Sequence, residues 1–169
     1  MKKCIFLDRD GVLNVDRVDY VYRIEDLIIP EGTIEALQRM KSAGYLLIVI
    51  TNQSGIAKGI YGREDVWKCH QYFQEQCGNL LDDIYFCPHH EKYNSASLTR
   101  KPGSLMIEKA IAKYEIDSEQ SWMIGDAERD IKAGQRAGVR TIHLTNRPAE
   151  SLSKIVRGTL LEASEVVTQ

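Results

Sequence analysis

The feature that most constrains the fold of this chain is a series of short apolar runs separated by helix-like segments. The runs are bounded by turn residues and occupy residues 4–7, 45–50, 84–86, 122–124 and 139–144. Segments with apolar residues at helical spacing lie at residues 33–43, 64–77, 105–114 and after Asp126. Continuous apolar runs are typical of strands covered on both faces. The alternation therefore predicts an α/β fold, a Rossmann-like parallel sheet with helices on both faces.

Size and charge narrow the class of protein further. The chain has 169 residues, of which 43% are hydrophobic and 27% charged, and its net charge is −2. These values predict a single globular domain over residues 1–169. No basic cluster indicates a nucleic-acid or membrane surface, and no apolar stretch approaches the roughly 20 residues of a membrane span. The apolar start of the chain breaks at Asp8, so we expect no signal peptide.

The four cysteines are few and scattered, at positions 4, 69, 77 and 87. This usage predicts a reduced cytoplasmic protein rather than a disulfide scaffold, and we expect a monomer. In the tail after Pro148, Leu152, Ile155 and Val156 predict a short amphipathic helix, and we expect residues 166–169 to fray.

Polar residues fall at the ends of three predicted strands. Asp8 and Asp10 follow the first apolar run, Thr51 follows the second, and Asp126 follows the run at 122–124 after Gly125. Ligands of open α/β sheets bind outside the carboxyl ends of the strands. A turn would explain a polar residue at any one of these positions, but not why polar residues follow all three strands. We therefore expect them to share one site.

Three carboxylates at one sheet edge predict a bound cation, and oxygen ligands suit Mg²⁺. The expected ligands are the Asp8 carboxylate, the Asp10 backbone carbonyl and Asp126. Asp130, one helical turn later, is either a group that holds a metal-bound water or an acid that favours the helix N-terminus. Strand alternation points Arg9 away from the site, which predicts a structural role for it.

A carboxylate on Mg²⁺ beside a cation suits phosphoryl transfer. Lys101, just before a predicted helix, is the natural cation, and Thr51 supplies a hydroxyl group. The turn at residues 52–55 offers backbone N–H groups for phosphate oxygens. Each of these features alone is more often an ordinary surface or turn feature.

Taken in order, D-R-D-G at Asp8, T-N at Thr51, K-P at Lys101 and G-D-x-x-x-D ending at Asp130 resemble the haloacid dehalogenase superfamily of phosphatases. The resemblance implies that Asp8 is the nucleophile, which forms an aspartyl-phosphate. It implies that Asp10 is the general acid and base. Thr51 and Lys101 would hold the phosphoryl group, and Asp126 would complete the Mg²⁺ site.

Finer motifs resemble one subfamily, the bacterial D-glycero-D-manno-heptose 1,7-bisphosphate 7-phosphatases. They include T-N-Q-S-G-I-A-K-G from Thr51, C-P-H-H from Cys87 and R-K-P-G from Arg100. The resemblance implies removal of the 7-phosphate of a small sugar bisphosphate, a step towards nucleotide-activated heptoses such as those used for lipopolysaccharide. It also implies substrate contacts by Asp16, Asp19, Tyr20, Thr51, Asn52, Gln53, Ser54, Arg100 and Lys101.

The spacing between motifs leaves no room for a large cap domain. Specificity should therefore depend on loops, chiefly residues 16–24 and 87–100.

Two departures from the subfamily stand out. Members often close a zinc site after C-P-H-H with two further cysteines, but residues 91–99 contain none. Cys87 and His89 are two ligands where structural zinc needs four, so we expect no bound zinc and a loop shape kept by packing. Many relatives also have a lysine where this chain has Ala127, which puts one substrate contact in doubt.

Other functions fit the motifs less well. Histidinol-phosphate phosphatase of histidine biosynthesis is the main alternative, since it shares D-R-D-G, T-N-Q and C-P-H. A nucleic-acid end phosphatase should show a basic groove, and a non-catalytic binding module should have lost a motif residue. Neither property is seen in this sequence.

Overall fold

The computed structural model describes residues 1–169 and contains one six-stranded parallel sheet with the strand order β3-β2-β1-β4-β5-β6. The strands are β1 (Cys4–Leu7), β2 (Leu46–Asn52), β3 (Asp83–Cys87), β4 (Trp122–Gly125), β5 (Arg140–Leu144) and β6 (Val156–Arg157). The α-helices are α1 (Thr33–Ser42), α2 (Arg63–Cys77), α3 (Leu105–Tyr114), α4 (Glu128–Arg136) and α5 (Leu160–Val167). Short 3₁₀ turns lie at Ile24–Asp26 and Pro148–Glu150. The predicted α/β fold is confirmed.

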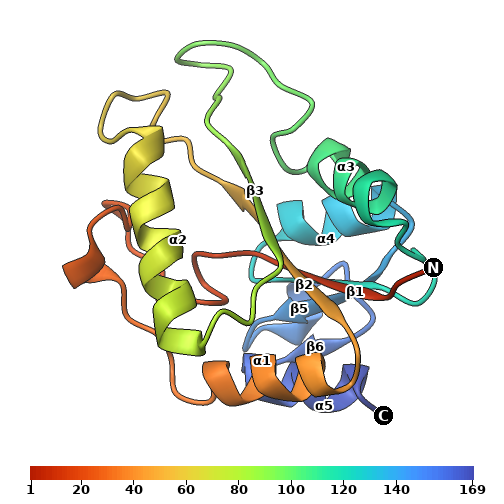
Figure 1. Ribbon diagram of the computed structural model, residues 1–169. Helices are drawn as coiled ribbons and strands as arrows, with labels where there is room; N and C mark the ends of the chain where they lie inside the picture. The colour runs from red at the N-terminus through yellow and green to blue at the C-terminus, as the bar shows by residue number, and fades with distance from the viewer.

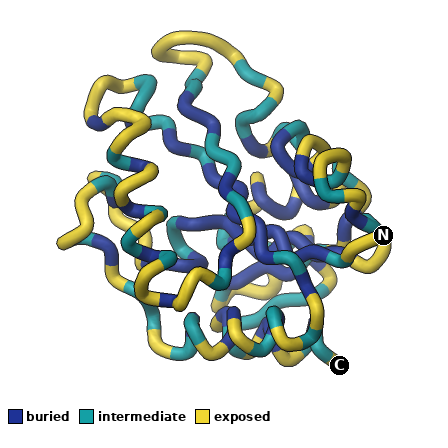
Figure 2. Tube along the Cα trace, in the orientation of Figure 1, coloured by how far each residue is buried: buried dark blue, intermediate teal, exposed yellow.

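Helices cover both faces of the sheet, with α3 and α4 on one side and α1 and α5 together on the other (Figure 1). In β1, Ile5 and Leu7 join a core with α1, α2 and α5, whereas Cys4 and Phe6 join a second core with α3 and α4. Every residue of β1 is therefore buried, which explains why its sequence is continuously apolar. Figure 2 shows the buried sheet inside a largely exposed outer layer of helices and loops.

The connections between strands match the expectation of a fold without a large cap. Only the 3₁₀ turn and α1 separate β1 from β2, and only α2 separates β2 from β3. The loop from β3 to α3 is the long excursion at the top of Figure 1, and its residues 91–96 are exposed. No helix is both long and apolar enough to cross a membrane.

The predicted organisation of the tail is wrong. Instead of a helix around residues 152–156, Val156 and Arg157 form β6 beside His143 and Leu144 of β5. The helix begins later, where the Thr159 side chain accepts a hydrogen bond from the Glu162 backbone N–H, a Thr-x-x-Glu signal that marks a helix start. Residues 166 and 167 do not fray, because Val167 is buried and its carbonyl accepts a hydrogen bond from the Tyr45 hydroxyl.

Candidate active site

The polar residues that follow β1, β2 and β4 meet at one edge of the sheet, as predicted. β1 lies between the other two strands, and Leu7 is in register with both Val49 and Ile124. The Asp8 backbone N–H continues this pairing to the Ile124 carbonyl. The parallel sheet therefore brings Asp8 beside Thr51 on one side and Asp126 on the other.

Lys101 is buried at the centre of this edge, with 1% of its surface exposed. Its Nζ lies 2.8 Å from Asp8 Oδ1 and 2.6 Å from Asp130 Oδ1, and it donates to the Ile50 carbonyl at 2.8 Å. The ammonium group has one hydrogen bond to a carbonyl and two close ion pairs with carboxylates. The ammonium group that the sequence predicted for the site is thus present, and it lies between Asp8 after β1 and Asp130 in α4.

Asn52 anchors the Lys101 main chain. Its Oδ1 accepts from the Lys101 N–H at 3.0 Å, and its Nδ2 donates to the Lys101 carbonyl at 3.1 Å. Asn52 was a candidate for phosphate contact. In the structure its side chain instead connects the end of β2 to the loop before α3.

Asp8, Asp126 and Asp130 form the only group of three or more potential metal-ligating side chains in the chain, with carboxylate oxygens within 4.8 Å of one another. Burial, together with Asp130, raises the pKa of Asp8 from 3.8 to about 8. Burial also raises the pKa of Asp126 to about 6. For Lys101, burial acts to lower the pKa, but Asp130 and Asp8 outweigh it and the pKa is raised.

The donor set fits a hard divalent cation. Asp126 Oδ1 is buried without a hydrogen-bond partner, and three carboxylates share one lysine. A cation bound by oxygen ligands would remove both unfavourable features.

Asp130 was expected either to hold a metal-bound water or to favour the N-terminus of the helix, and the structure shows the second of these together with a contact to Lys101. Its Oδ2 accepts a hydrogen bond from the Ala127 backbone N–H at 3.0 Å and caps α4. Its Oδ1 contacts Lys101. Asp130 therefore connects the start of α4 to the buried lysine.

Two glycines allow these close approaches. Gly11 has a φ of +87°, and a Cβ atom there would lie 2.1 Å from Asp126 Oδ2. A Cβ atom at Gly125 would lie 2.2 Å from the Cβ of Asp130. The glycines of D-R-D-G and G-D-x-x-x-D thus let the loop after Asp10 and the start of α4 pack against the acids.

Asp10 is held by three neighbouring side chains. Arg9 Nη2 lies 2.9 Å from Asp10 Oδ1, Asn14 Nδ2 donates to the same oxygen at 2.9 Å, and Gln53 Nε2 donates to Oδ2 at 3.1 Å. The predicted orientation of Arg9 away from the site is wrong. Strand β1 ends at Leu7, so strand alternation no longer applies at Arg9, which turns back to Asp10 and to the Val21 carbonyl.

Known proteins with the same arrangement were found by comparison. A model of the HAD-hydrolase-like family matches residues 98–151. The D-glycero-beta-D-manno-heptose-1,7-bisphosphate 7-phosphatase of Haemophilus ducreyi is 40% identical over 83% of this chain and 81% of that protein. The D-glycero-alpha-D-manno-heptose-1,7-bisphosphate 7-phosphatase of Burkholderia mallei is 38% identical over 92% of this chain and 88% of that protein. The chain belongs to the heptose-bisphosphate 7-phosphatase family.

A solved structure agrees with this assignment. The D,D-heptose 1,7-bisphosphate phosphatase of B. bronchiseptica, crystallised with magnesium and phosphate, superposes with a TM-score of 0.88 and 27% identity. The match covers 98% of this chain and 97% of that one. The family resemblance and the haloacid dehalogenase fold without a large cap are confirmed.

In this family member, the loop at residues 16–24 lies beside the site, where the Val21 carbonyl accepts from Arg9 and the Tyr22 ring stacks on Tyr61. Burial and the nearby Asp10 raise the pKa of Asp16. Asp19 is exposed and forms a two-pronged ion pair with Arg17 at 2.9 Å. Tyr20 has a positive φ of 69°, and Lys58 Nζ lies 5.2 Å from the centroid of its ring. Direct substrate contact by these side chains stays a prediction.

The second predicted specificity loop, residues 87–100, brings Arg100 to the same side. Arg100 Nη1 is 3.5 Å from the His89 carbonyl, and Nε is 3.6 Å from the exposed Glu91 carboxylate. These contacts are long, so much of the hydrogen-bonding capacity of the guanidinium is unused.

Cys87 and His89 each contact other side chains of the loop. The Cys87 thiol is buried and accepts from Thr99 Oγ1 at 3.1 Å. His89 Nδ1 instead lies within 3.3 Å of Asn94 and Ser95 side chains. Polar packing shapes this loop in the structure, and the absence of zinc stays a prediction.

Two further side chains support the site and were not foreseen. His143 Nε2 donates to the Asp126 carbonyl at 3.0 Å, while Nδ1 accepts from Ser151 at 2.8 Å. Tyr61 donates to Gln53. The sequence did contain a signal for His143, because it lies one residue before the end of an apolar strand, as a site residue would. Tyr61 lies in a loop without a motif, so nothing in the sequence pointed to it.

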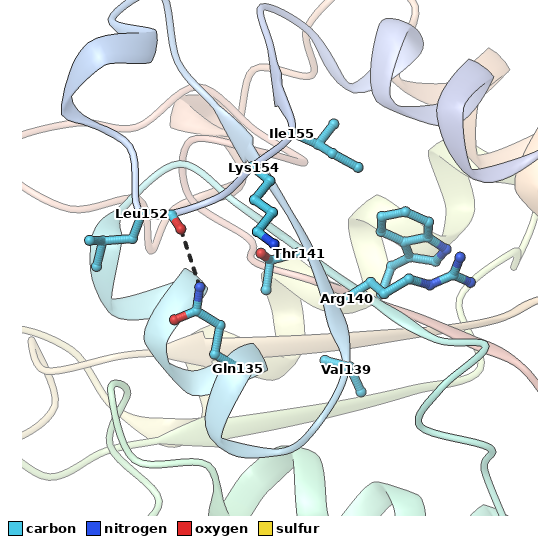
Figure 3. A pocket seen from close by; sticks show the side chains of 8 residues that line it. Gln135, Val139, Arg140, Thr141, Leu152, Lys154 and Ile155 are labelled. Atoms are coloured by element: carbon cyan, nitrogen blue, oxygen red, sulfur yellow. Dashed lines mark hydrogen bonds between the residues drawn. The ribbon is translucent and has the colours of Figure 1, made fainter.

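A separate cavity of about 260 Å³ lies where β4 and β5 begin, at the edge of the sheet opposite the acids. Figure 3 shows Arg140, Lys154 and Thr141 at this cavity and the hydrogen bond from Gln135 to the Leu152 carbonyl. Its lining contains no carboxylate. It therefore lacks the ligands for a metal-dependent phosphoryl transfer.

Proposed function

We propose that this protein is a Mg²⁺-dependent phosphatase that removes the 7-phosphate of D-glycero-D-manno-heptose 1,7-bisphosphate and leaves the 1-phosphate in place. The observation that carries the proposal is the buried Asp8 carboxylate, 2.8 Å from Lys101 and within 4.8 Å of Asp126. The names of relatives that cover most of the chain supply the substrate.

Mg²⁺ would be held by the Asp8 carboxylate, the Asp10 carbonyl and Asp126. When bound, it supplies positive charge that offsets the repulsion between the Asp8 carboxylate and the phosphate oxygens. The unpaired Asp126 oxygen and the raised pKa of Asp8, caused by burial and Asp130, support this assignment.

The chemistry then proceeds in two steps. An Asp8 oxygen attacks phosphorus, the bond from phosphorus to the C7 oxygen breaks, and Asp10 gives its proton to the departing alcohol. Asp10 next takes a proton from the water that attacks the aspartyl-phosphate, which releases phosphate and restores Asp8. The hydroxyl of Thr51 and the ammonium of Lys101 would donate to the phosphoryl oxygens, so Lys101 must exchange one of its present acceptors.

Recognition of the sugar is assigned to the two loops beside the uncapped site. We assign the 1-phosphate to Arg100, because a guanidinium fork suits a phosphate and its present contacts are long. Asp16, Asp19, Tyr20 and Ser54 would contact the sugar or the transferred phosphate. The relatives include enzymes for both anomers, so the loops rather than the acids should select the anomer.

We further propose that the enzyme works as a cytoplasmic monomer on the route to nucleotide-activated heptoses. All four cysteines are free and buried, as suits a reducing compartment.

The test is phosphate release with Mg²⁺ from the α and β anomers of heptose 1,7-bisphosphate and from histidinol phosphate. We expect kcat/KM for one heptose anomer to exceed that for histidinol phosphate by at least about 100-fold, since hydrogen-bonded recognition gives large discrimination. A larger kcat/KM for histidinol phosphate would reject the proposed substrate and leave the phosphatase chemistry intact.

A further inference from the structure

Gln53 is the centre of a buried hydrogen-bond network behind Asp10. Its side chain is 1% exposed. Nε2 donates to Asp10 Oδ2 at 3.1 Å and to Thr51 Oγ1 at 2.9 Å. Oε1 accepts from the Tyr61 hydroxyl at 2.6 Å. One amide group therefore contacts both an expected proton donor and an expected phosphate-binding hydroxyl.

The orientation of this amide depends on Tyr61. A carboxylate only accepts hydrogen bonds, so the NH₂ end of Gln53 must face Asp10. The Tyr61 hydroxyl donates to the oxygen end, and burial raises the pKa of Tyr61, so the hydroxyl keeps its proton. Without that donor, the amide could turn over and present its oxygen to the Asp10 carboxylate, which would repel it.

Tyr61 in turn is fixed by the loop at residues 16–24. Its ring stacks on Tyr22 with centroids 5.1 Å apart and meets the edge of Tyr20 at 6.0 Å. The backbone of Gly55 runs against the ring, and a Cβ atom there would lie 2.0 Å from it. Contacts thus run from residues 20–22 through Tyr61 and Gln53 to Asp10.

We propose that Tyr61 and Gln53 are positioning residues that orient Asp10 for proton transfer to the departing alcohol. The aromatic contacts of Tyr61 with Tyr20 and Tyr22 connect this orientation to the loop at residues 16–24. The inference rests on the proposed role of Asp10 as the general acid. Both are proposed to act through other residues: Tyr61 acts through Gln53, and Gln53 acts through Asp10 and also contacts Thr51.

The experiment compares leaving groups. An alkyl oxygen needs a proton as it departs, whereas p-nitrophenolate leaves without one. The comparison is made on kcat/KM, which covers the reaction up to this departure and leaves out the later hydrolysis of the aspartyl-phosphate that both substrates share. Tyr61→Phe removes the hydroxyl and keeps the ring, and Gln53→Met removes the donors at similar size. We expect Tyr61→Phe to lower kcat/KM for heptose bisphosphate about tenfold and for p-nitrophenyl phosphate by less than about twofold. Gln53→Met also loses the bond to Thr51, so it should lower kcat/KM for both substrates, and more for heptose bisphosphate.

Tyr114→Phe is the matched control, because it removes a part-buried hydrogen bond from a tyrosine hydroxyl to Asp83, at the opposite end of β3 from the site. It should leave kcat/KM for both substrates unchanged. Asp10→Asn is the reference. It should also lower kcat/KM more for heptose bisphosphate than for p-nitrophenyl phosphate, and the loss should be larger than for Tyr61→Phe. Equal losses on both substrates for Tyr61→Phe, with Asp10→Asn selective, would reject the positioning role alone. A non-selective Asp10→Asn would reject the role of Asp10 itself and the inference with it.

Discussion

The edge formed by β1, β2 and β4, with Lys101 buried against it, and residues 88–100 of the loop from β3 to α3 belong to the same site but are built in opposite ways. At the sheet edge, Asp8, Lys101 and Asp130 are almost fully buried and each contacts another charged group. In the loop, residues 91–96 are exposed, and Arg100 makes only long contacts. This contrast is in keeping with the proposal that the buried sheet edge carries the reaction and that the exposed loop selects the substrate.

The largest test of the buried sheet edge is Asp8→Asn. The amide has the size of the carboxylate and can still accept from Lys101, so the fold should persist, but it cannot form the aspartyl-phosphate. We expect Mg²⁺-dependent phosphate release to fall by about 10⁴-fold or more, with a melting temperature close to that of the unchanged protein. Turnover near the original rate would remove Asp8 as the nucleophile.

Lys101→Met tests how far the sheet edge depends on its buried cation. The change leaves Asp8 and Asp130 close together without a counter-charge, so the free energy of unfolding without metal should fall by about 3 kcal/mol. Lys109→Met, on the exposed face of the following helix α3, should change it by less than about 0.5 kcal/mol. Urea unfolding measures both, and similar values for the two variants would contradict a buried ion-pair network.

Mg²⁺ should stabilise the protein more as the pH rises. Burial and Asp130 raise the pKa of Asp8 from 3.8 to about 8, so without metal the fold is favoured below about pH 4 and loses stability as the pH rises through about 8. Mg²⁺ binds the deprotonated acids, including Asp126, whose pKa burial raises to about 6. The increase in melting temperature with 10 mM Mg²⁺ should be about 5 °C larger at pH 8 than at pH 6.

Asp126→Asn is the control for this measurement, and it should remove most of the Mg²⁺ effect at pH 8. An increase that is equal at both pH values would mean that the acids are already ionised at pH 6.

Sequence patterns predicted the edge formed by β1, β2 and β4 well, because short stretches of sequence contain both the apolar run of each strand and the polar residue that follows it. Apolar runs covered on both faces must be strands, and parallel strands must deliver Asp8, Thr51 and Asp126 to one edge. The orientation of Arg9 was predicted wrongly because it depends on where β1 ends, one residue before Asp8. The contacts of Tyr61 and Gln53 come from loop geometry that no spacing encodes, and β6 has only two residues, too few for a periodic pattern.

In the exposed loop, Arg100→Ala should weaken binding without slowing the chemistry. If Arg100 contacts the 1-phosphate, KM for heptose bisphosphate should rise about tenfold with kcat changed less than threefold, and p-nitrophenyl phosphate should be unaffected. Arg100→Lys should recover only part of the loss, because an ammonium cannot donate as a planar fork. A fall in kcat for both substrates would place Arg100 with the buried sheet edge instead.

The smallest effect is expected for metal exchange at the β3–α3 loop. The Cys87 thiol accepts from Thr99, and His89 lies against Asn94 and Ser95, so side-chain packing holds the loop without four metal ligands. Protein stripped with a chelator and given Mg²⁺ alone should therefore regain its full kcat/KM and melting temperature. Recovery that required added Zn²⁺ would show that this loop, like the sheet edge, is organised around a cation, and would reduce the contrast between the two regions.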